Sequence, residues 1–228
     1  MKALLLNGPG QPFSIETIED PTPEKGYAVA KVLACGSGLT IQHVKAGRIT
    51  VNYPRIIGHE IVGEIVEING QGGDLEIGTP VTAFFYLTCG HCRWCNIDRE
   101  TLCDNFRGYI GREIDGGYAE YIKLPIENFI KIPEEIDYKN NLLETAVVCD
   151  AVATPLKVIK KARISSFDKV GVIGAGGGLG IHMLKMLKLN NISAIGIDTK
   201  TEKFNTCNEN GAEFSVSPME NDLSLIHI

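Results

Sequence analysis

The feature that most constrains the fold is a strand, a glycine cluster, a helix and a second strand in direct succession. Residues 169–174 form an apolar run typical of a buried strand, and a glycine-rich stretch follows. A helical pattern over 181–189 comes next, then a second apolar run over 193–198 and another helical segment over 201–208. Strands that alternate with helices at this spacing build a parallel sheet. The C-terminal part of the chain is therefore predicted to contain a βαβ unit.

The glycine cluster is predicted to hold the phosphates of a dinucleotide. Small residues between a strand and a helix let the backbone approach a pyrophosphate at the helix N-terminus. Asp198 ends the next strand, where its carboxylate can accept from a ribose 2′-hydroxyl and repel a 2′-phosphate. This favours NAD, while Lys200 and Lys203 nearby keep NADP open. The alternative is a flexible glycine loop with Asp198 as a helix cap. The predicted cofactor-binding residues are Gly174, Gly176, Gly177, Gly178, Leu179, Gly180, Asp198 and Lys203.

The parallel sheet is predicted to be incomplete. A doubly wound nucleotide domain needs about six strands, and only these two and a short run over 213–216 fit before residue 228. The last six residues match one reading frame of a common transposase sequencing adapter. We therefore expect a partial nucleotide-binding domain over 151–222 and a non-native tail over 223–228.

Residues 1–150 are predicted to form a mostly antiparallel β domain. Short β-like runs recur at close spacing and are separated by Gly, Pro and Asn; they cover 28–33, 61–68, 79–86 and 118–123. From residue 142 the pattern changes to a stretch rich in Ala, Val, Leu and Lys that extends to residue 161. Pro155 is its only strong breaker, which predicts a kinked or two-piece helix.

Four cysteines predict a structural zinc site in a lobe of about residues 88–104. Their spacing is C-x2-C-x2-C-x7-C, and four thiolates this close can surround one Zn²⁺ tetrahedrally without an open position for chemistry. An iron–sulfur cluster is the main alternative, although the ferredoxin-type run places its last cysteine three residues on. Unligated thiols are the remaining alternative. The predicted ligands are Cys89, Cys92, Cys95 and Cys103.

Charge and patterning exclude several classes of partner. The 22 Lys and Arg residues against 28 Asp and Glu give a net charge of −6, and no basic stripe is present that could bind a nucleic acid or an anionic membrane. Neither a signal peptide nor a membrane-spanning stretch is recognisable. We expect a cytoplasmic protein whose seven cysteines are thiols or metal ligands.

A third motif, Gly58-His59-Glu60-Ile61-Val62-Gly63, stands before the cysteines and the glycine cluster. The three motifs in this order resemble the zinc-dependent medium-chain alcohol dehydrogenase family. The resemblance implies a GroES-like catalytic domain followed by a Rossmann domain. It also implies an NAD(P)-dependent oxidoreductase that acts on a small alcohol or carbonyl substrate, with a homo-oligomer for the full-length protein.

The resemblance assigns catalytic roles, and one of its positions is lost. Thr40 matches the residue that shares a proton with the substrate, and His43 matches the relay histidine. The first ligand of the family's catalytic zinc, a cysteine, falls on Gly38, which has no side chain to offer. The other implied ligands are His59, Glu60 and Asp150; Cys149, one residue away, is interpreted as a buried small apolar residue.

Loss of the cysteine at Gly38 leaves alternatives open. His59, Glu60 and Asp150 with water form a set that can hold a catalytic zinc. If no catalytic zinc binds, His59 is a structural histidine. The alternative for Thr40 is a helix cap, and the alternative for His43 is a surface imidazole. The protein is then a carbonyl or enoyl reductase without a catalytic zinc, or a nucleotide-binding module that holds a structural zinc and catalyses no reaction.

Overall fold

The computed structural model describes residues 1–219, and the chain divides into two compact units between Cys149 and Asp150. The predicted tail over 223–228 lies outside the described residues. No helix within residues 1–219 is long and apolar enough to cross a membrane. Each unit is described by itself below.

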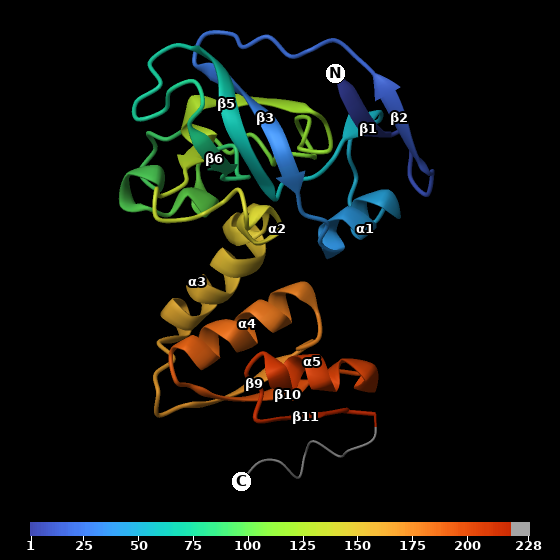
Figure 1. Cartoon of the computed structure of the whole chain (residues 1–228), viewed down its shortest axis with the longest axis vertical. Helices are drawn as coiled ribbons and strands as arrows, with labels where there is room; N and C mark the ends of the chain where they lie inside the picture. The colour runs from blue at the N-terminus through green and yellow to red at the C-terminus, as the bar shows by residue number, and fades with distance from the viewer. Residues whose placement is uncertain (220–228) are drawn as a thin grey trace. The chain divides into compact units, whose positions relative to one another are not determined.

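The first unit is built on a five-stranded antiparallel sheet (Figure 1). Its strand order is β7-β3-β5-β6-β8. Small and branched apolar side chains, among them Ala30 and Ile65, alternate along the central strands and fill the main core. The strands are β3 (Tyr27–Cys35), β5 (Ile61–Asn69), β6 (Pro80–Ala83), β7 (Tyr121–Pro125) and β8 (Phe129–Lys131). The antiparallel domain predicted from the short β-like runs is therefore present.

A smaller sheet and a short helix complete this unit. The sheet has the order β2-β1-β4, with β1 at Lys2–Leu6, β2 at Phe13–Thr17 and β4 at Arg55–Ile56. Helix α1 (Leu39–Lys45) buries Ile41 and Val44 in a cluster that also contains Leu6 and Ile57. Between β6 and β7 the chain has little regular structure, only the 3₁₀ turns η1 (Cys95–Ile97) and η2 (Glu100–Leu102); η3 (Ile126–Asn128) precedes β8.

The helical stretch predicted over 142–161 is in two pieces. Helix α2 (Leu142–Ala146) and helix α3 (Ala153–Ala162) are separated by a π-helical turn, η4 (Val148–Val152). The break therefore precedes Pro155 instead of coinciding with it. Pro155 is the third residue of α3, where a backbone N–H has no partner within the helix, so the helix tolerates it there.

The second unit confirms the predicted βαβ pattern. Strands β9 (Lys169–Ile173), β10 (Ser193–Ile197) and β11 (Phe214–Val216) form a parallel sheet in the order β11-β10-β9. Helix α4 (Gly178–Leu189) connects the first two strands; η5 (Thr201–Lys203) and α5 (Phe204–Glu209) connect the second and third. Leu184 and Leu187 of α4 pack on Val172 and Ala194 of the sheet.

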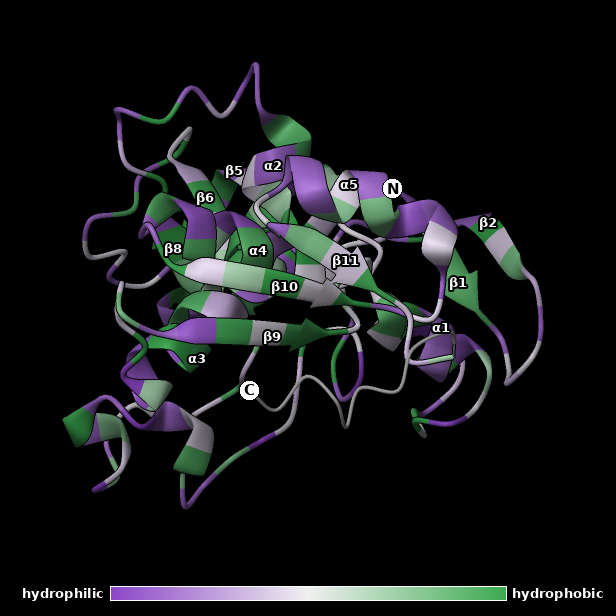
Figure 2. Ribbon diagram, turned by 90° about the horizontal axis from the view of Figure 1, so that it is seen from below, coloured by the Kyte–Doolittle hydropathy of each residue, from purple (hydrophilic) through white to green (hydrophobic). Residues whose placement is uncertain are grey.

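The opposite face of this sheet is apolar, and none of the described helices of the second unit covers it. Paired positions on neighbouring strands share a face, which places Ile173 with Ile197 and Ile195 with Phe214. Ile173 is 85% exposed. Figure 2 shows the three strands with green segments facing the viewer and the helices behind them. Such a patch on an isolated chain favours self-association.

A lysine on the uncovered face is therefore expected to reduce self-association. Ile173→Lys should lower the light-scattering mass of the purified chain, because a charge interrupts the apolar patch. Ile15→Lys is the matched control, since Ile15 is a similarly exposed isoleucine (76%) on β2 of the first unit. A parent chain that is monodisperse at all concentrations would contradict this prediction.

Candidate functional site

The glycine cluster forms a tight turn between β9 and α4. The amide of Gly174 donates to the carbonyl of Ile197 at 2.8 Å, and the amide of Gly177 donates to the carbonyl of Gly174 at 2.9 Å. Gly177 is the N-cap of α4, and no side chain caps it. The first amides of α4 are thus left for an anion, as expected for a pyrophosphate site.

Gly180 lets this turn pack against its helix. A Cβ atom there would overlap the carbonyl oxygen of Gly174 and lie 2.7 Å from the Cα of Ala175. Both obstacles are backbone, which has no rotamer to move into. Any side chain at this position would therefore displace the turn or the helix.

Asp198 lies against the same turn. Its carboxylate accepts from the amide of Gly176 at 2.8 Å and from that of Lys200 at 3.0 Å, while Lys203 Nζ donates to the carbonyl of Gly176 at 2.9 Å. Partial burial acts to raise the pKa of Asp198, but these amides and the two lysine charges outweigh it and lower the pKa. The N-cap of η5 is Lys200, so the alternative of Asp198 as a helix cap is wrong.

The four cysteines of the lobe gather around one point. Their sulfur atoms all lie within 4.8 Å of one another, and the structure describes no second gathering of three or more His, Cys, Asp or Glu ligands in residues 1–219. Neighbouring sulfurs are 3.5 Å apart for Cys92 and Cys95, 3.5 Å for Cys89 and Cys103, and 3.9 Å for Cys92 and Cys103. A tetrahedron with Zn–S bonds of about 2.3 Å has edges of about 3.8 Å. The thiols therefore fit a tetrahedral zinc ion.

Backbone amides favour the thiolate form of two cysteines of the lobe. Hydrogen bonding to the backbone of His91 is the main cause that lowers the pKa of Cys89 to about 5, and the backbone of Cys95 lowers the pKa of Cys92. Burial raises the pKa of Cys95 to about 11. His91 Nδ1 donates to the carbonyl of Cys89 at 2.6 Å, and the group of possible metal ligands contains the four cysteines without His91.

His59 and Glu60 are buried beside a backbone crossing. The amide of Gly117 donates to the carbonyl of Gly58 at 2.9 Å. A Cβ on Gly116 would overlap that same carbonyl, so the two segments approach this closely only without a side chain there. The exposed fractions are only 8% for His59 and 4% for Glu60. Burial of a polar pair costs free energy and is often retained for function.

The Glu60 carboxylate lies next to the loop that contains Gly38. A Cβ on Gly36 would overlap Glu60 Oε2 and lie 2.9 Å from Glu60 Cβ, whereas one on Gly38 would lie at an ordinary 3.7 Å from Oε2. The carboxylate thus faces the position where the resemblance expects a cysteine ligand. Cys35 ends β3 and packs into the core, and burial raises the pKa of its thiol to about 12.

Thr40 and His43 lie on α1, three residues apart and so on one face of the helix. Gly38 is the N-cap, and therefore the alternative of Thr40 as the helix cap is wrong. Arg48 Nη1 lies 3.2 Å from His43 Nδ1. Since an arginine only donates, Nδ1 accepts this bond and the proton of the neutral ring is on Nε2.

Asp150 and Cys149 lie on the π-helical turn η4, one on each side of the division between the units. Thr154 Oγ1 donates to Asp150 Oδ1 at 3.2 Å. Cys149 is half-buried, accepts from Thr82 Oγ1 at 3.3 Å and lines a cavity of about 460 Å³ in the first unit. It is therefore not the buried apolar residue expected from the sequence. Asp150 belongs to the second unit, and its combination with His59 and Glu60 stays a prediction.

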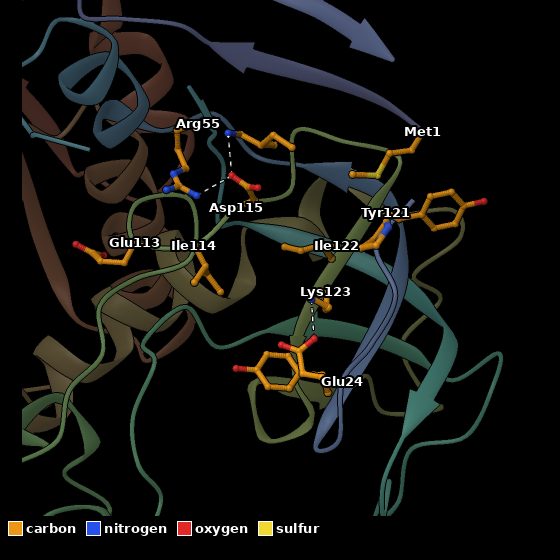
Figure 3. Close-up of a pocket in the computed structure, with 13 residues that line it drawn as sticks. Met1, Glu24, Arg55, Glu113, Ile114, Asp115, Tyr121, Ile122 and Lys123 are labelled. Atoms are coloured by element: carbon orange, nitrogen blue, oxygen red, sulfur yellow. Dashed lines mark hydrogen bonds and ion pairs between the residues drawn. The ribbon is translucent and has the colours of Figure 1, made fainter. Parts of the chain in front are cut away.

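A cavity of about 370 Å³ elsewhere in the first unit is lined by charges that are already paired. Figure 3 shows Arg55 directed at Asp115 and Lys123 at Glu24; the ion pairs measure 2.8 Å and 2.6 Å. The hydrogen bond from Lys123 is the main cause that lowers the pKa of Glu24. These pairs hold β4, β7 and the neighbouring loops together, and the site residues lie elsewhere.

Known proteins resemble this chain over nearly its whole length. The model of the alcohol dehydrogenase GroES-like domain matches residues 24–134. An alcohol dehydrogenase of Geobacillus stearothermophilus is 32% identical over 226 residues, which make up 97% of this chain and 65% of that protein. The crystal structure of an Escherichia coli CFT073 protein, described as the short chain alcohol dehydrogenase RspB with NADH, matches with a TM-score of 0.85 at 30% identity. The match covers 100% of this chain and 66% of the Escherichia coli chain.

The chain belongs to the medium-chain alcohol dehydrogenase family. The predicted fold class, a GroES-like antiparallel domain followed by a partial parallel-sheet domain, is confirmed. An acryloyl-coenzyme A reductase of Sulfurisphaera tokodaii is also 32% identical, over 89% of this chain and 60% of that protein. The chain thus spans less than two thirds of the length of these relatives.

The close approach at Gly180 predicts a position-specific effect of alanine. Gly180→Ala should destabilise the second unit by about 1–3 kcal/mol, because its methyl group meets backbone on both sides. Gly178→Ala is the matched control: nothing lies within 4 Å of its Cβ position, and alanine in a helix gains up to about 1 kcal/mol over glycine. Thermal unfolding of the two variants checks this, and equal melting temperatures would contradict it.

Proposed function

We propose that this chain is part of an oxidoreductase that transfers a hydride between a small alcohol or carbonyl compound and a nicotinamide cofactor. The observation that carries the proposal is the contact between the Asp198 carboxylate and the amide of Gly176 at 2.8 Å. It places an ionised acid beside a phosphate-sized turn at the start of α4, the arrangement that dinucleotide sites use. Membership of the alcohol dehydrogenase family supports the redox assignment.

In this proposal the second unit binds NAD and orients it. The first amides of α4 and the turn before it hold the pyrophosphate. Asp198 accepts from the adenosine ribose hydroxyls and disfavours a 2′-phosphate, while Lys203 is occupied by the carbonyl of Gly176. The bound nicotinamide would supply or accept the hydride. The preference for NAD over NADP follows from the charge of Asp198.

The four-cysteine lobe is proposed to hold a structural zinc ion. A loop of this size with two short 3₁₀ turns has little apolar core of its own, and a bound metal would substitute for that core. All four positions of a tetrahedral ion would be filled by Cys89, Cys92, Cys95 and Cys103, which leaves no position for substrate.

In the first unit, we assign proton transfer to Thr40 and His43. The Thr40 hydroxyl would share a proton with the substrate oxygen, and His43 would pass that proton to solvent. Half-exposure of His43 suits this relay because the ring reaches solvent. Nδ1 would accept the proton in place of its bond from Arg48, and Nε2–H would release one to solvent. A zinc ion held by His59, Glu60 and Asp150 would supply Lewis acidity there; Cys149 is a further donor on the same turn.

A second candidate function is reduction of a carbonyl or conjugated acceptor without a catalytic metal. Gly38 favours it, because the side chain that would complete a charged ligand set is missing while the Glu60 carboxylate faces that position. The acryloyl-coenzyme A reductase relative supports it as well. Thr40 would then donate a hydrogen bond to the acceptor oxygen.

Asp198 is expected to control cofactor binding. Asp198→Ala should weaken binding of NADH by about 10-fold or more, because a hydrogen bond to a charged group is lost, and it should narrow the preference over NADPH. Asp168→Ala is the matched control, since Asp168 of the same unit also accepts a backbone amide, that of Ser165 at 2.7 Å. Fluorescence titration of both nucleotides checks this; equal affinities for NADH in the two variants would contradict it.

Zinc content distinguishes the two candidate functions. Cys103→Ser should remove one zinc ion per chain, measured by mass spectrometry of the metal, whereas Cys207→Ala, a buried thiol of the second unit, should remove none. Retention of all zinc in Cys103→Ser would contradict the structural site. A second zinc ion in the parent chain that is lost in Asp150→Asn or Cys149→Ser would support alcohol oxidation. A parent chain with only the zinc of the lobe would support metal-free reduction.

A further inference from the structure

A row of aromatic rings connects His59 with the residues that follow the cysteine lobe. The His59 imidazole packs on Phe85 with ring centroids 5.0 Å apart, and Phe85 packs on Tyr86 at 4.7 Å. Tyr86 in turn lies 5.1 Å from Tyr109, which lies 4.8 Å from Phe106. Each distance is in the range of favourable ring pairs. We call Phe85, Tyr86, Tyr109 and Phe106 the aromatic cluster.

The backbone beneath the aromatic cluster is held by hydrogen bonds from two directions. On one side, the amide of Ile110 donates to the carbonyl of Phe85 at 3.0 Å, and the amide of Leu87 donates to that of Gly108 at 2.9 Å. On the other side, Asn128 Nδ2 donates to the carbonyls of Phe84 at 2.6 Å and of Tyr86 at 2.9 Å. The segment that presents Phe85 to His59 is therefore fixed in register.

Asn128 is 2% exposed, and its Oδ1 is buried without a hydrogen-bond partner in the structure. A buried oxygen without a hydrogen-bond partner costs free energy. Retention of the amide is explained by its two donated bonds, which no apolar side chain could replace.

The aromatic cluster is also joined to the lobe itself. Asn105, one residue before Phe106, donates from Nδ2 to Cys89 Sγ at 3.7 Å. Arg107, one residue after it, donates from Nη2 to the carbonyl of Thr88 at 3.1 Å. Order in the four-cysteine set thus fixes the loop that carries Phe106 and Tyr109.

We propose that Phe85 is a positioning residue for His59, and that the aromatic cluster makes the position of the His59 ring depend on an intact four-cysteine lobe. The lobe would then act on the candidate site at a distance, beyond its local structural role. The physical basis of this coupling is the contact between two segments, the one that contains Phe85 and Tyr86 and the one that contains Phe106 and Tyr109, whose rings pack on one another. The inference rests on the proposed function for the role of His59, but the position of the ring does not depend on turnover.

The test is a double-mutant cycle read by NMR of the histidine side chains of the whole chain. The protein has five histidines, and His59→Gln assigns the ring signals of His59. Cys103→Ser should shift or broaden these signals in the parent, although residue 103 carries no ring of the cluster. In Phe85→Leu the signals should already be shifted, and adding Cys103→Ser should change them no further.

Matched variants make the outcome specific. Phe84→Leu removes the neighbouring ring, which pairs with Phe85 at 6.3 Å and with Tyr86 at 5.4 Å but is not among the ring partners of His59; here the response to Cys103→Ser should persist. Phe85→Tyr keeps the ring and should restore the coupling. The signals of His182, on α4 of the second unit, should stay constant throughout.

Two results would overturn the proposal. One is a His59 signal that does not respond to Cys103→Ser in the parent; the other is an equal response in Phe85→Leu and in the parent. Cys103→His keeps a metal ligand and should leave the His59 signal near its parent position. That result would show that Cys103→Ser acts through the metal site. Failure of NADH binding or of turnover would refute the proposed function and leave this result unchanged.

Discussion

The candidate site depends on close approach of backbone to backbone at positions without a side chain. In the first unit, Gly116 lies against the carbonyl of Gly58, directly before the buried pair His59 and Glu60. In the second unit, Gly180 lies against Gly174 and so sets the start of α4. The contact of Gly116 fixes the segment with the buried imidazole and carboxylate, and the contact of Gly180 fixes the first amides of α4. The chemistry of both units is thus positioned by the main chain.

A second constraint is the small amount of core available to the lobe between β6 and β7. Its 3₁₀ turns contribute few buried side chains, and the zinc ion proposed for the four thiols would supply the cross-links that apolar packing does not. The rings of Phe106 and Tyr109 join this region to Phe85, which packs against the main core. The lobe is therefore continuous with the packing around His59 and is not an independent appendage.

Features that are local in the sequence were predictable, and those that need tertiary contact were not. The cysteine spacing and the strand–glycine–helix succession predict the gathered thiols and the βαβ unit because short-range geometry sets both. The sequence points to a break at Pro155, but the helical stretch is interrupted earlier, at η4. A proline in the first turn of α3 removes no hydrogen bond of that helix. Cys149 was misjudged because its partner, Thr82, is 67 residues away. The same holds for the ring stack on His59 and the Glu60 carboxylate beside Gly38, which no spacing encodes.

The most direct test of the account is a crystal structure of the chain grown with zinc and NADH, with anomalous scattering recorded at the zinc edge. The account predicts an anomalous peak among the four sulfurs of the lobe, the pyrophosphate of NADH at the first amides of α4, and the adenosine ribose on Asp198. A nucleotide bound away from the glycine turn, or a lobe without zinc, would contradict it.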